Sequence, residues 1–297
     1  MRMKVKIIGL LLAMVSAGYA QELNESLSLR GVYEAKVREC LEKPHRLGDY
    51  SLDLWGDGAS VFYMSRDPEL EAFQNKDKSA SAAFGINLES MHPIERCGES
   101  SFIVQKNSPK PDTLMLLYQG VTHTFYNYEP IPAQDWQPEE GDTLIADYAC
   151  QKARCDFRGR QWTVWYTLDI PYSNGPWKLG GLPGLILKAD DAAGDFSFTC
   201  IRISTAKEKV VLPVIRESIG NHFITEEISA PKDLQRAVKK HLETVLRTNE
   251  IPRLRRDQTD EERAAVWAKI RSQKRTACLI EDFDAPKDSA PKKKGRN

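Results

Sequence analysis

Hydrophobic and polar residues alternate along much of the first two thirds of the chain, as in β-strands that expose one face to solvent. Residues 33–37 alternate apolar and charged side chains. Residues 51–54 and 60–64 flank the turn sequence Gly-Asp-Gly, and residues 114–118 and 121–128 flank Gln-Gly. Each of these two pairs predicts a β-hairpin.

Further segments continue this pattern. Residues 144–150 and 158–168 predict single strands, and residues 185–189 and 196–203 predict a hairpin around residues 190–194. Many strands with short connections indicate an antiparallel sheet. We therefore expect a mainly β fold with C-terminal α-helices. Because strands twist, we expect the antiparallel sheet to be strongly curved or partly closed.

The apolar spacing lengthens to three or four residues after position 231. One stripe predicts an amphipathic helix, and its members are Leu234, Val238, Leu242 and Val245. Thr259 and Glu262 form a capping box that predicts a second helix. We expect a helical C-terminal extension over residues 231–283. Residues 284–297 are poor in apolar side chains and rich in lysine, which predicts a basic disordered tail.

The first 20 residues have the pattern of a signal peptide. Basic residues at positions 2, 4 and 6 precede an apolar run over residues 7–15, and small residues at positions 18 and 20 mark a cleavage site. We expect cleavage near Ala20 and export, so that the protein is periplasmic, associated with the outer membrane or secreted. No later apolar run is long enough to cross a bilayer, so we expect no transmembrane segment in the mature chain.

Composition narrows the functional classes. Of the 297 residues 41% are hydrophobic, which is enough for a substantial core, and 42 basic residues balance 42 acidic ones. This balance argues against a nucleic-acid partner. The body is acidic and the region after residue 231 is basic, which fits either a solvated helical face or docking to an acidic partner.

Six cysteines all lie in the expected mature chain. An even number of cysteines in an exported protein favours disulfide bonds. Four residues separate Cys150 from Cys155, unlike the CxxC motif of thiol oxidoreductases and zinc sites. We expect structural disulfides, with Cys150–Cys155 and Cys40–Cys97 as the candidate pairs, and a metal site only as the weaker alternative.

The sequence contains none of the common local catalytic or nucleotide-binding motifs. Its five histidines are far apart, and none lies three or four residues from another, so no metal site is predicted. We expect no cofactor. Scattered side chains can still converge in a fold, so this observation does not exclude an enzyme.

Residues 148–191 concentrate aromatic residues, glycines and prolines. Trp162 and Tyr166 share one face of a predicted strand, and Trp165 lies on the other face. The strand ends before Pro171, and the glycines and prolines that follow require a specific loop shape. The members of this structural motif are Gly175, Pro176, Gly181, Leu182, Pro183 and Gly184.

Two interpretations of this segment remain open. In the first, the loop is a structural plug in which Trp177, Leu179 and Leu182 fill the open end of the sheet. In the second, it shapes a binding cleft with aromatic walls and with cations for an anionic group. The candidate ligand-binding residues are Arg158, Arg160, Trp165, Tyr166, Trp177 and Lys178.

Residues 181–186 read Gly-Leu-Pro-Gly-Leu-Ile, the signature after which the GLPGLI family of exported bacterial proteins is named. Further motifs from CQKA at residues 150–153 to GPWK at residues 175–178 extend the resemblance over about residues 126–200. The chain resembles this family, which implies export and a β-rich domain that we place at residues 21–230. The resemblance implies no reaction, because the family has no established activity.

Three functional hypotheses follow. The first is a non-catalytic exported protein that binds a small hydrophobic or amphipathic ligand, or an envelope protein, beside residues 158–184. The second is an exported hydrolase, and its acid–base set would be Asp169, Asp190, Tyr166 and Arg160. The third is a scaffold partner of an outer-membrane assembly that docks through the basic C-terminal region.

Overall fold

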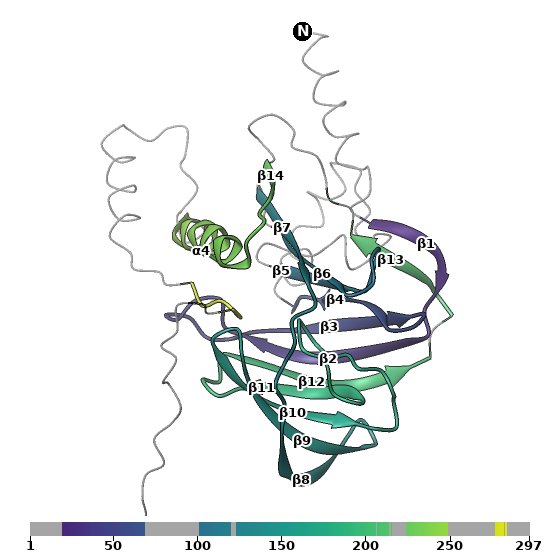
Figure 1. Cartoon of the computed structure of the whole chain (residues 1–297). Coiled ribbons are helices and arrows are strands. Elements are labelled where there is room, and N and C mark those ends of the chain that lie inside the picture. Colours follow the sequence, from purple (N-terminus) through teal and green to yellow (C-terminus); the bar gives the residue numbers. More distant parts are fainter. Residues whose placement is uncertain are drawn as a thin grey trace, which may run out of the picture.

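The computed structural model describes residues 20–68, 101–119, 123–205, 207–213, 215, 224–248, 277–281 and 283. These residues form a large β-sheet, a two-stranded ribbon and one α-helix (Figure 1). The strands are β1 (Ala20–Ser26), β2 (Leu29–Val37), β3 (Arg46–Trp55), β4 (Ala59–Arg66), β5 (Ser101–Lys106), β6 (Thr113–Gln119), β7 (His123–Pro130), β8 (Gln137–Ile145), β9 (Tyr148–Phe157), β10 (Arg160–Thr167), β11 (Leu185–Asp191), β12 (Phe196–Ser204), β13 (Lys209–Pro213) and β14 (Ile224–Glu227). The helix is α4 (Pro231–Thr248).

Twelve of the described strands form one sheet in the order β14-β7-β6-β5-β4-β3-β2-β12-β11-β10-β9-β8. Neighbouring strands run antiparallel except for β14, which is parallel to β7. The two edge strands, β14 and β8, do not pair with each other, so the described sheet is open. The mainly β, antiparallel architecture predicted from the sequence is therefore confirmed, and the sheet is not closed.

The predicted hairpins are present as β3–β4, β6–β7 and β11–β12. The single strand predicted over residues 144–150 is wrong, because β8 ends at Ile145 and β9 begins at Tyr148. Ala146 and Asp147 between them have positive φ angles of 47° and 68°, as in a type I′ turn. Such turns favour Asn-Gly or Asp-Gly, so this Ala-Asp pair carries no recognisable turn signal.

The sheet buries hydrophobic side chains on both faces. The inner face, which α4 covers in part, carries the larger cluster and includes Phe62 and Trp162. On the opposite face a second cluster joins Val61 and Tyr63 to Val210 of the β1–β13 ribbon. Central strands such as β4 are thus buried on both sides, which explains why residues 61–64 of β4 are all apolar rather than alternating.

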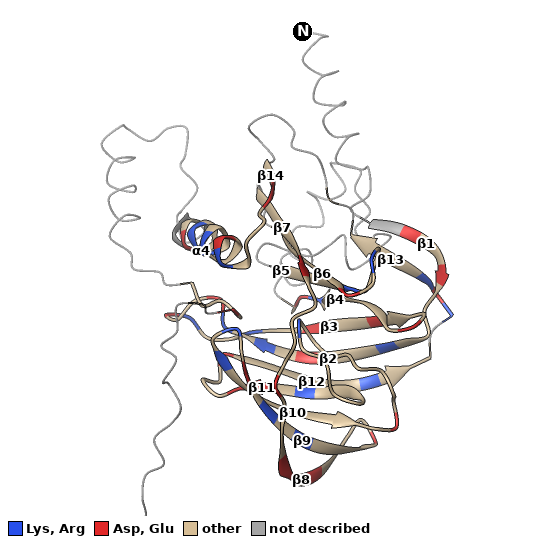
Figure 2. Cartoon of the chain, viewed as in Figure 1, with Lys and Arg blue, Asp and Glu red and all other residues tan. Residues whose placement is uncertain are grey.

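Helix α4 turns its apolar stripe toward the inner face of the sheet. Leu234, Val238 and Leu242 are buried in the larger cluster, as the spacing predicts. The exposed side of the helix carries basic and acidic side chains (Figure 2). Within the described part of the chain, no helix has the length and hydrophobicity needed to cross a membrane.

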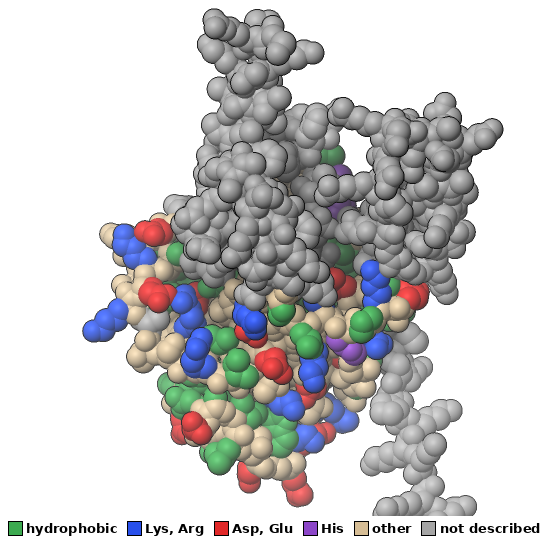
Figure 3. All heavy atoms as spheres, turned by 180° about the vertical axis from the view of Figure 1, so that it is seen from behind, with side chains coloured by type: hydrophobic (Ala, Val, Ile, Leu, Met, Phe, Trp, Pro, Cys, Tyr) green, Lys and Arg blue, Asp and Glu red, His purple; other side chains and the backbone are tan. Residues whose placement is uncertain are grey.

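The exposed surface mixes apolar and charged groups. Leu144 and Leu168 are the most exposed large hydrophobic residues near the β8 edge, at 73% and 50%. Charges of both signs are interspersed with hydrophobic side chains on the face seen from behind (Figure 3). Ion pairs such as Lys152–Glu139, at 2.8 Å between Nζ and Oε2, join the neighbouring strands β9 and β8.

Several expectations concern residues outside the described ranges. They are the leader over residues 1–19, the second C-terminal helix that begins at Thr259, and the tail over residues 284–297. The proposed boundary at residue 231 stays a prediction. Helix α4, which follows that boundary, shares its hydrophobic cluster with the sheet.

The described cysteines correct part of the disulfide prediction. Cys150 and Cys155 both lie on β9 and have free thiols. Five residues along a strand span about 16 Å, whereas a disulfide needs Cα atoms within about 7 Å, so a Cys150–Cys155 bond is ruled out. Burial raises the pKa of Cys150 to about 11 and that of Cys155 to about 12. The Cys40–Cys97 pair stays a prediction, because Cys97 lies outside the described residues.

We expect iodoacetamide at mildly alkaline pH to leave Cys150 and Cys155 unmodified in the native protein, because both thiols are buried and protonated. After unfolding in guanidinium without reductant, both should react as separate thiols. Peptide mass mapping of the two samples measures this difference. A peptide pair linked through Cys150 and Cys155 would contradict the strand geometry.

Candidate functional site

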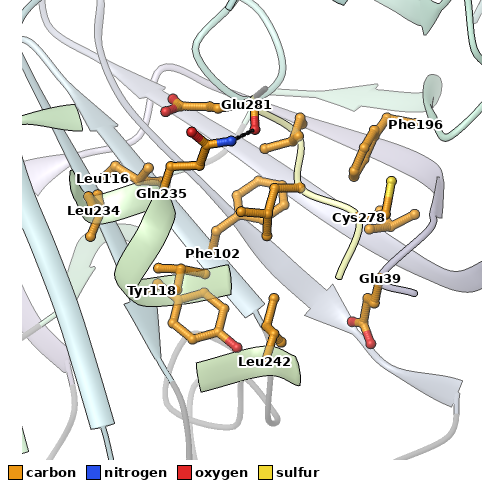
Figure 4. Close-up of a pocket in the computed structure, with 14 residues that line it drawn as sticks. Glu39, Phe102, Leu116, Tyr118, Phe196, Leu234, Gln235, Leu242, Cys278 and Glu281 are labelled. Atoms are coloured by element: carbon orange, nitrogen blue, oxygen red, sulfur yellow. Dashed lines mark hydrogen bonds between the residues drawn. The ribbon is translucent and has the colours of Figure 1, made fainter. Parts of the chain in front are cut away.

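A cavity lies between the inner face of the sheet, helix α4 and residues 277–281, which we call the strap (Figure 4). Its volume is about 70 Å³, and it is partly open to solvent. The sheet side contributes Val37, Phe102, Leu116, Tyr118 and Phe196. The facing side contributes Leu234, Gln235, Val238 and Leu242 of α4, Glu39, and residues 278–281 of the strap. Most of the lining is apolar, which is typical of sites that bind hydrophobic groups.

Polar contacts attach the strap to its surroundings. The backbone N–H of Cys278 donates to the carbonyl oxygen of Glu39 at 2.9 Å. The Gln235 side chain donates from Nε2 to the carbonyl oxygen of Glu281 at 3.0 Å. The strap is thus one wall of the cavity that is fixed by individual hydrogen bonds and not by a continuous strand ladder.

Arg160 of β10 also attaches the strap. Its Nη2 and Nε donate to the carbonyl oxygen of Leu279 at 2.6 and 3.1 Å. Its Nη1 lies 2.7 Å from Asp191 Oδ2 and 3.1 Å from Asp195 Oδ2. Burial lowers the pKa of Arg160, but the nearby carboxylates outweigh burial and raise the pKa overall. This candidate ligand-binding residue therefore directs its donors to the strap and to two internal carboxylates.

Residues 168–184, which connect β10 to β11, fill one end of the inner face, and we call them the plug. Trp177, Leu179 and Leu182 are buried in the main cluster. The Trp177 ring lies 5.4 Å from that of Trp162 between centroids, and its backbone has a φ of 51°. This left-handed conformation is strained for a bulky residue. The burial of these side chains agrees with the plug interpretation.

Two of the candidate cations belong to an internal ion-pair network. Lys178 is fully buried, and its Nζ lies 2.5 Å from Oε1 of Glu129 on β7. The same ammonium group pairs with Glu281 of the strap. Arg158, in the turn between β9 and β10, pairs with the other oxygen of Glu129. Both cations thus face carboxylates of the protein.

A second buried lysine, which the sequence reading does not single out, attaches the plug to β5. Lys106 Nζ donates to Asn174 Oδ1 at 2.9 Å, to Gly175 O at 3.0 Å and to Leu179 O at 2.7 Å. Burial lowers the pKa of Lys106 to about 7. The three acceptors oppose that effect, since they match the three protons of the charged form.

The remaining aromatic candidates lie on opposite faces of β10. Tyr166 points inward, and its hydroxyl donates to Gln151 Oε1 at 2.9 Å. Trp165 lies on the outer face, where the Nζ of Lys152 is 6.0 Å from its ring centroid. All six candidate ligand-binding residues are described, and none of them lines the cavity. Their role in ligand binding stays a prediction.

Sequence reasoning identifies one wall of the cavity and misses the others. The apolar stripe of α4 predicts that Leu234 and Val238 are buried. Gln235 carries no signal, because it occupies an ordinary polar position beside the stripe. The strap has only five residues, which is too short for a periodic pattern. A strand residue such as Phe102 can be predicted to be buried, but the sequence does not indicate which element packs against it.

The residues of the hydrolase hypothesis do not form one cluster. Arg160 and Tyr166 lie on the inner face of β10, separated along the strand. Asp190 lies on the outer face of β11, where it accepts a hydrogen bond from Ser197 Oγ at 2.6 Å. Asp169 is exposed beyond the end of β10. The described residues also contain no group of three or more side chains suited to hold a metal ion.

Comparison with known proteins gives one family match. A family model described as "Protein of unknown function (Porph_ging)" matches residues 158–188. This segment runs from the β9–β10 turn through β10 and the plug into β11. A search of the curated proteins found no match.

Solved structures give distant similarities. Two crystal structures of PNGF-II, in space groups C2 and P21, match with TM-scores of 0.40 and 0.41 at 14% and 13% identity. The two matches cover 71% and 72% of this chain. They cover only 33% and 34% of the PNGF-II chains, so this chain spans about a third of their length. The LolA superfamily protein NE2245 from Nitrosomonas europaea matches with a TM-score of 0.21 at 10% identity, over 65% of this chain and 90% of that chain. TM-scores this low do not establish a shared fold.

Replacing Gly184 with alanine should strongly destabilise the protein. An added Cβ would lie 1.9 Å from the carbonyl oxygen of Thr167, and this backbone contact cannot relax unless the plug shifts. We expect the free energy of unfolding to fall by about 3 kcal/mol or more, as measured by urea unfolding. Gly180→Ala is the control, because its added Cβ would lie 3.2 Å from Ser173 O. Equal losses in the two variants would contradict the steric argument.

Proposed function

We propose that this chain is an exported protein that binds a small hydrophobic or amphipathic ligand in the cavity between the sheet, α4 and the strap. The observation that carries the proposal is the lining of the cavity. Its walls are aliphatic and aromatic side chains, with Glu39, Gln235 and Glu281 as the main polar exceptions. Moving a hydrocarbon chain from water into such a site gains about 0.8 kcal/mol for each CH₂ group that is buried.

The size of the cavity restricts the ligand. A volume of about 70 Å³ accepts one narrow chain or its terminal part. A bulkier ligand would require an outward shift of the strap or of α4. The sheet wall is held by continuous strand ladders, whereas the strap is held by individual hydrogen bonds and by the Glu281–Lys178 ion pair. We therefore propose that the strap, rather than the sheet, adjusts when a ligand binds.

This proposal gives Arg160 a role that differs from direct ligand contact. Its two hydrogen bonds to Leu279 O set the position of the strap. Asp191 and Asp195 hold the guanidinium group in place from the other side. Arg160 is therefore a positioning residue for one wall of the cavity.

Export is part of the proposal and rests on the leader and on the resemblance to the GLPGLI family. Cleavage near Ala20 is compatible with the fold. It would leave strand β1 from Gln21 onward, which still pairs with Leu212 of β13. The mature protein would thus keep the ribbon that covers the second hydrophobic cluster.

A series of linear primary alcohols tests the binding proposal. We expect the dissociation constant to fall about fourfold per added CH₂, from the gain of about 0.8 kcal/mol, until the cavity is full. Isothermal titration calorimetry measures the constants. Affinity that does not depend on chain length would count against an apolar site.

Filling the cavity should remove this binding. Val238 lines the cavity, and Val238→Phe places a ring in its space, so we expect the longer alcohols to bind at least roughly tenfold more weakly. The unfolding midpoint should be unchanged or higher, because the ring fills empty volume. Lys239→Phe, at an exposed position of the same helix, is the control. Unchanged binding in Val238→Phe would place the alcohols elsewhere on the protein.

A further inference from the structure

One end of the cavity is polar. Gln235 lines it, and its side chain is buried, with 8% of the residue exposed. Its Nε2 donates to Glu281 O, while its Oε1 has no hydrogen-bond partner among the described residues. The Gln235 amide and the Glu281 side chain lie at this end, and Tyr118 and Leu242 lie at the other, on the side of the cavity where Glu39 also lies (Figure 4). A buried acceptor without a partner is rare in folded proteins and calls for an explanation.

A second amide without partners lies beside the same wall. Asn127 of β7 is directly opposite Leu116 of β6, and Leu116 lines the cavity. Residues directly opposite in an antiparallel ladder point to the same face. Asn127 is fully buried, and neither its Oδ1 nor its Nδ2 has a partner in the described part of the chain. The two amides together therefore leave two acceptors and one donor unsatisfied.

The charged groups near the cavity are already neutralised by protein partners. Glu39 accepts a hydrogen bond from Arg46 at 2.7 Å. Glu281 pairs with Lys178, which also pairs with Glu129. A charged ligand head would lose its water here without gaining an unpaired counter-ion, which is costly. An uncharged head avoids that cost.

From these observations we infer that the ligand is an amphipathic molecule with a narrow hydrocarbon chain and an uncharged head that both donates and accepts hydrogen bonds, such as a carboxamide or an alcohol. The inference rests on the proposed function and adds the chemical class of the ligand. Gln235 Oε1 accepts a hydrogen bond from the head. Asn127, which adjoins the lining residue Leu116 but does not itself line the cavity, would offer a donor and an acceptor once the head reaches past Leu116. The chain lies along the apolar part of the cavity toward Tyr118 and Leu242.

Four probes with the same eight-carbon chain test the inference, namely octanamide, 1-octanol, octanoate and octylammonium at neutral pH. We expect octanamide and 1-octanol to bind the full chain at least roughly tenfold more tightly than the two ions. In Gln235→Leu this preference should shrink to within roughly threefold, because the acceptor for the head is lost. Gln137→Leu removes an exposed glutamine from the edge strand β8 and should leave the preference unchanged.

Asn127→Leu is the second variant, since it does not touch the strap. Replacing a buried amide that has no partners by an apolar side chain should raise the unfolding midpoint and weaken octanamide binding more than octylammonium binding. Higher stability together with lower head-group preference supports a ligand-binding amide. Higher stability with the preference retained overturns the role of Asn127.

The outcomes separate this inference from the proposed function. If none of the four probes binds, the apolar site itself is refuted. If octanoate or octylammonium binds as tightly as octanamide and Val238→Phe still abolishes binding, the site stands and the uncharged head is refuted. A preference that survives in both Gln235→Leu and Asn127→Leu also overturns the inference.

Discussion

The buried ammonium group of Lys178 joins three parts of the molecule that are distant in sequence. It belongs to the plug, and it pairs with Glu129 at the end of β7 and with Glu281 in the strap. A fully buried charge is tolerated only when its partners are in place, and removing one partner of such a pair costs about 3–5 kcal/mol. The plug, strand β7 and the strap are therefore coupled. The cavity wall that contains Glu281 thus depends on the shape of the plug, which lies outside the cavity.

This coupling explains why a loop rich in glycine and proline occupies a buried position. Gly184 allows the backbone to approach Thr167, and Trp177 adopts a strained conformation that the surrounding packing maintains. The matched family segment, residues 158–188, contains four cations, and their carboxylate partners lie outside it. These cations are Arg158, Arg160, Lys178 and Lys188. The segment thus supplies a preformed shape and positive charges, and the rest of the chain supplies the carboxylates. The contacts of the segment are thus contacts within the protein that stabilise its fold.

The sequence predicted local structure well and long-range contacts poorly. Alternation located most strands, and the stripe that contains Leu234 located the buried face of α4, because both patterns follow from backbone geometry. The turn at Ala146 was missed because its residue types are unusual for its conformation. The carboxylates that pair with Arg158, Arg160 and Lys178 cannot be read from spacing. Lys178, for example, pairs with Glu129, 49 residues away. Gln235 could not be identified from the sequence either, because only the fold shows that this polar position beside the apolar stripe is buried.

Two kinds of interior polar group differ in how well they are partnered. The cations of the plug and of β10 are matched to carboxylates, and such matched pairs fix positions without leaving charge for a ligand. The amides of Gln235 and Asn127 are buried with unused hydrogen-bonding capacity, which lowers stability unless something else compensates for it. A protein that needed only a stable core would gain by replacing Asn127 with an apolar residue. Keeping it beside an otherwise apolar cavity is the arrangement expected of a site that trades stability for recognition of an uncharged polar head.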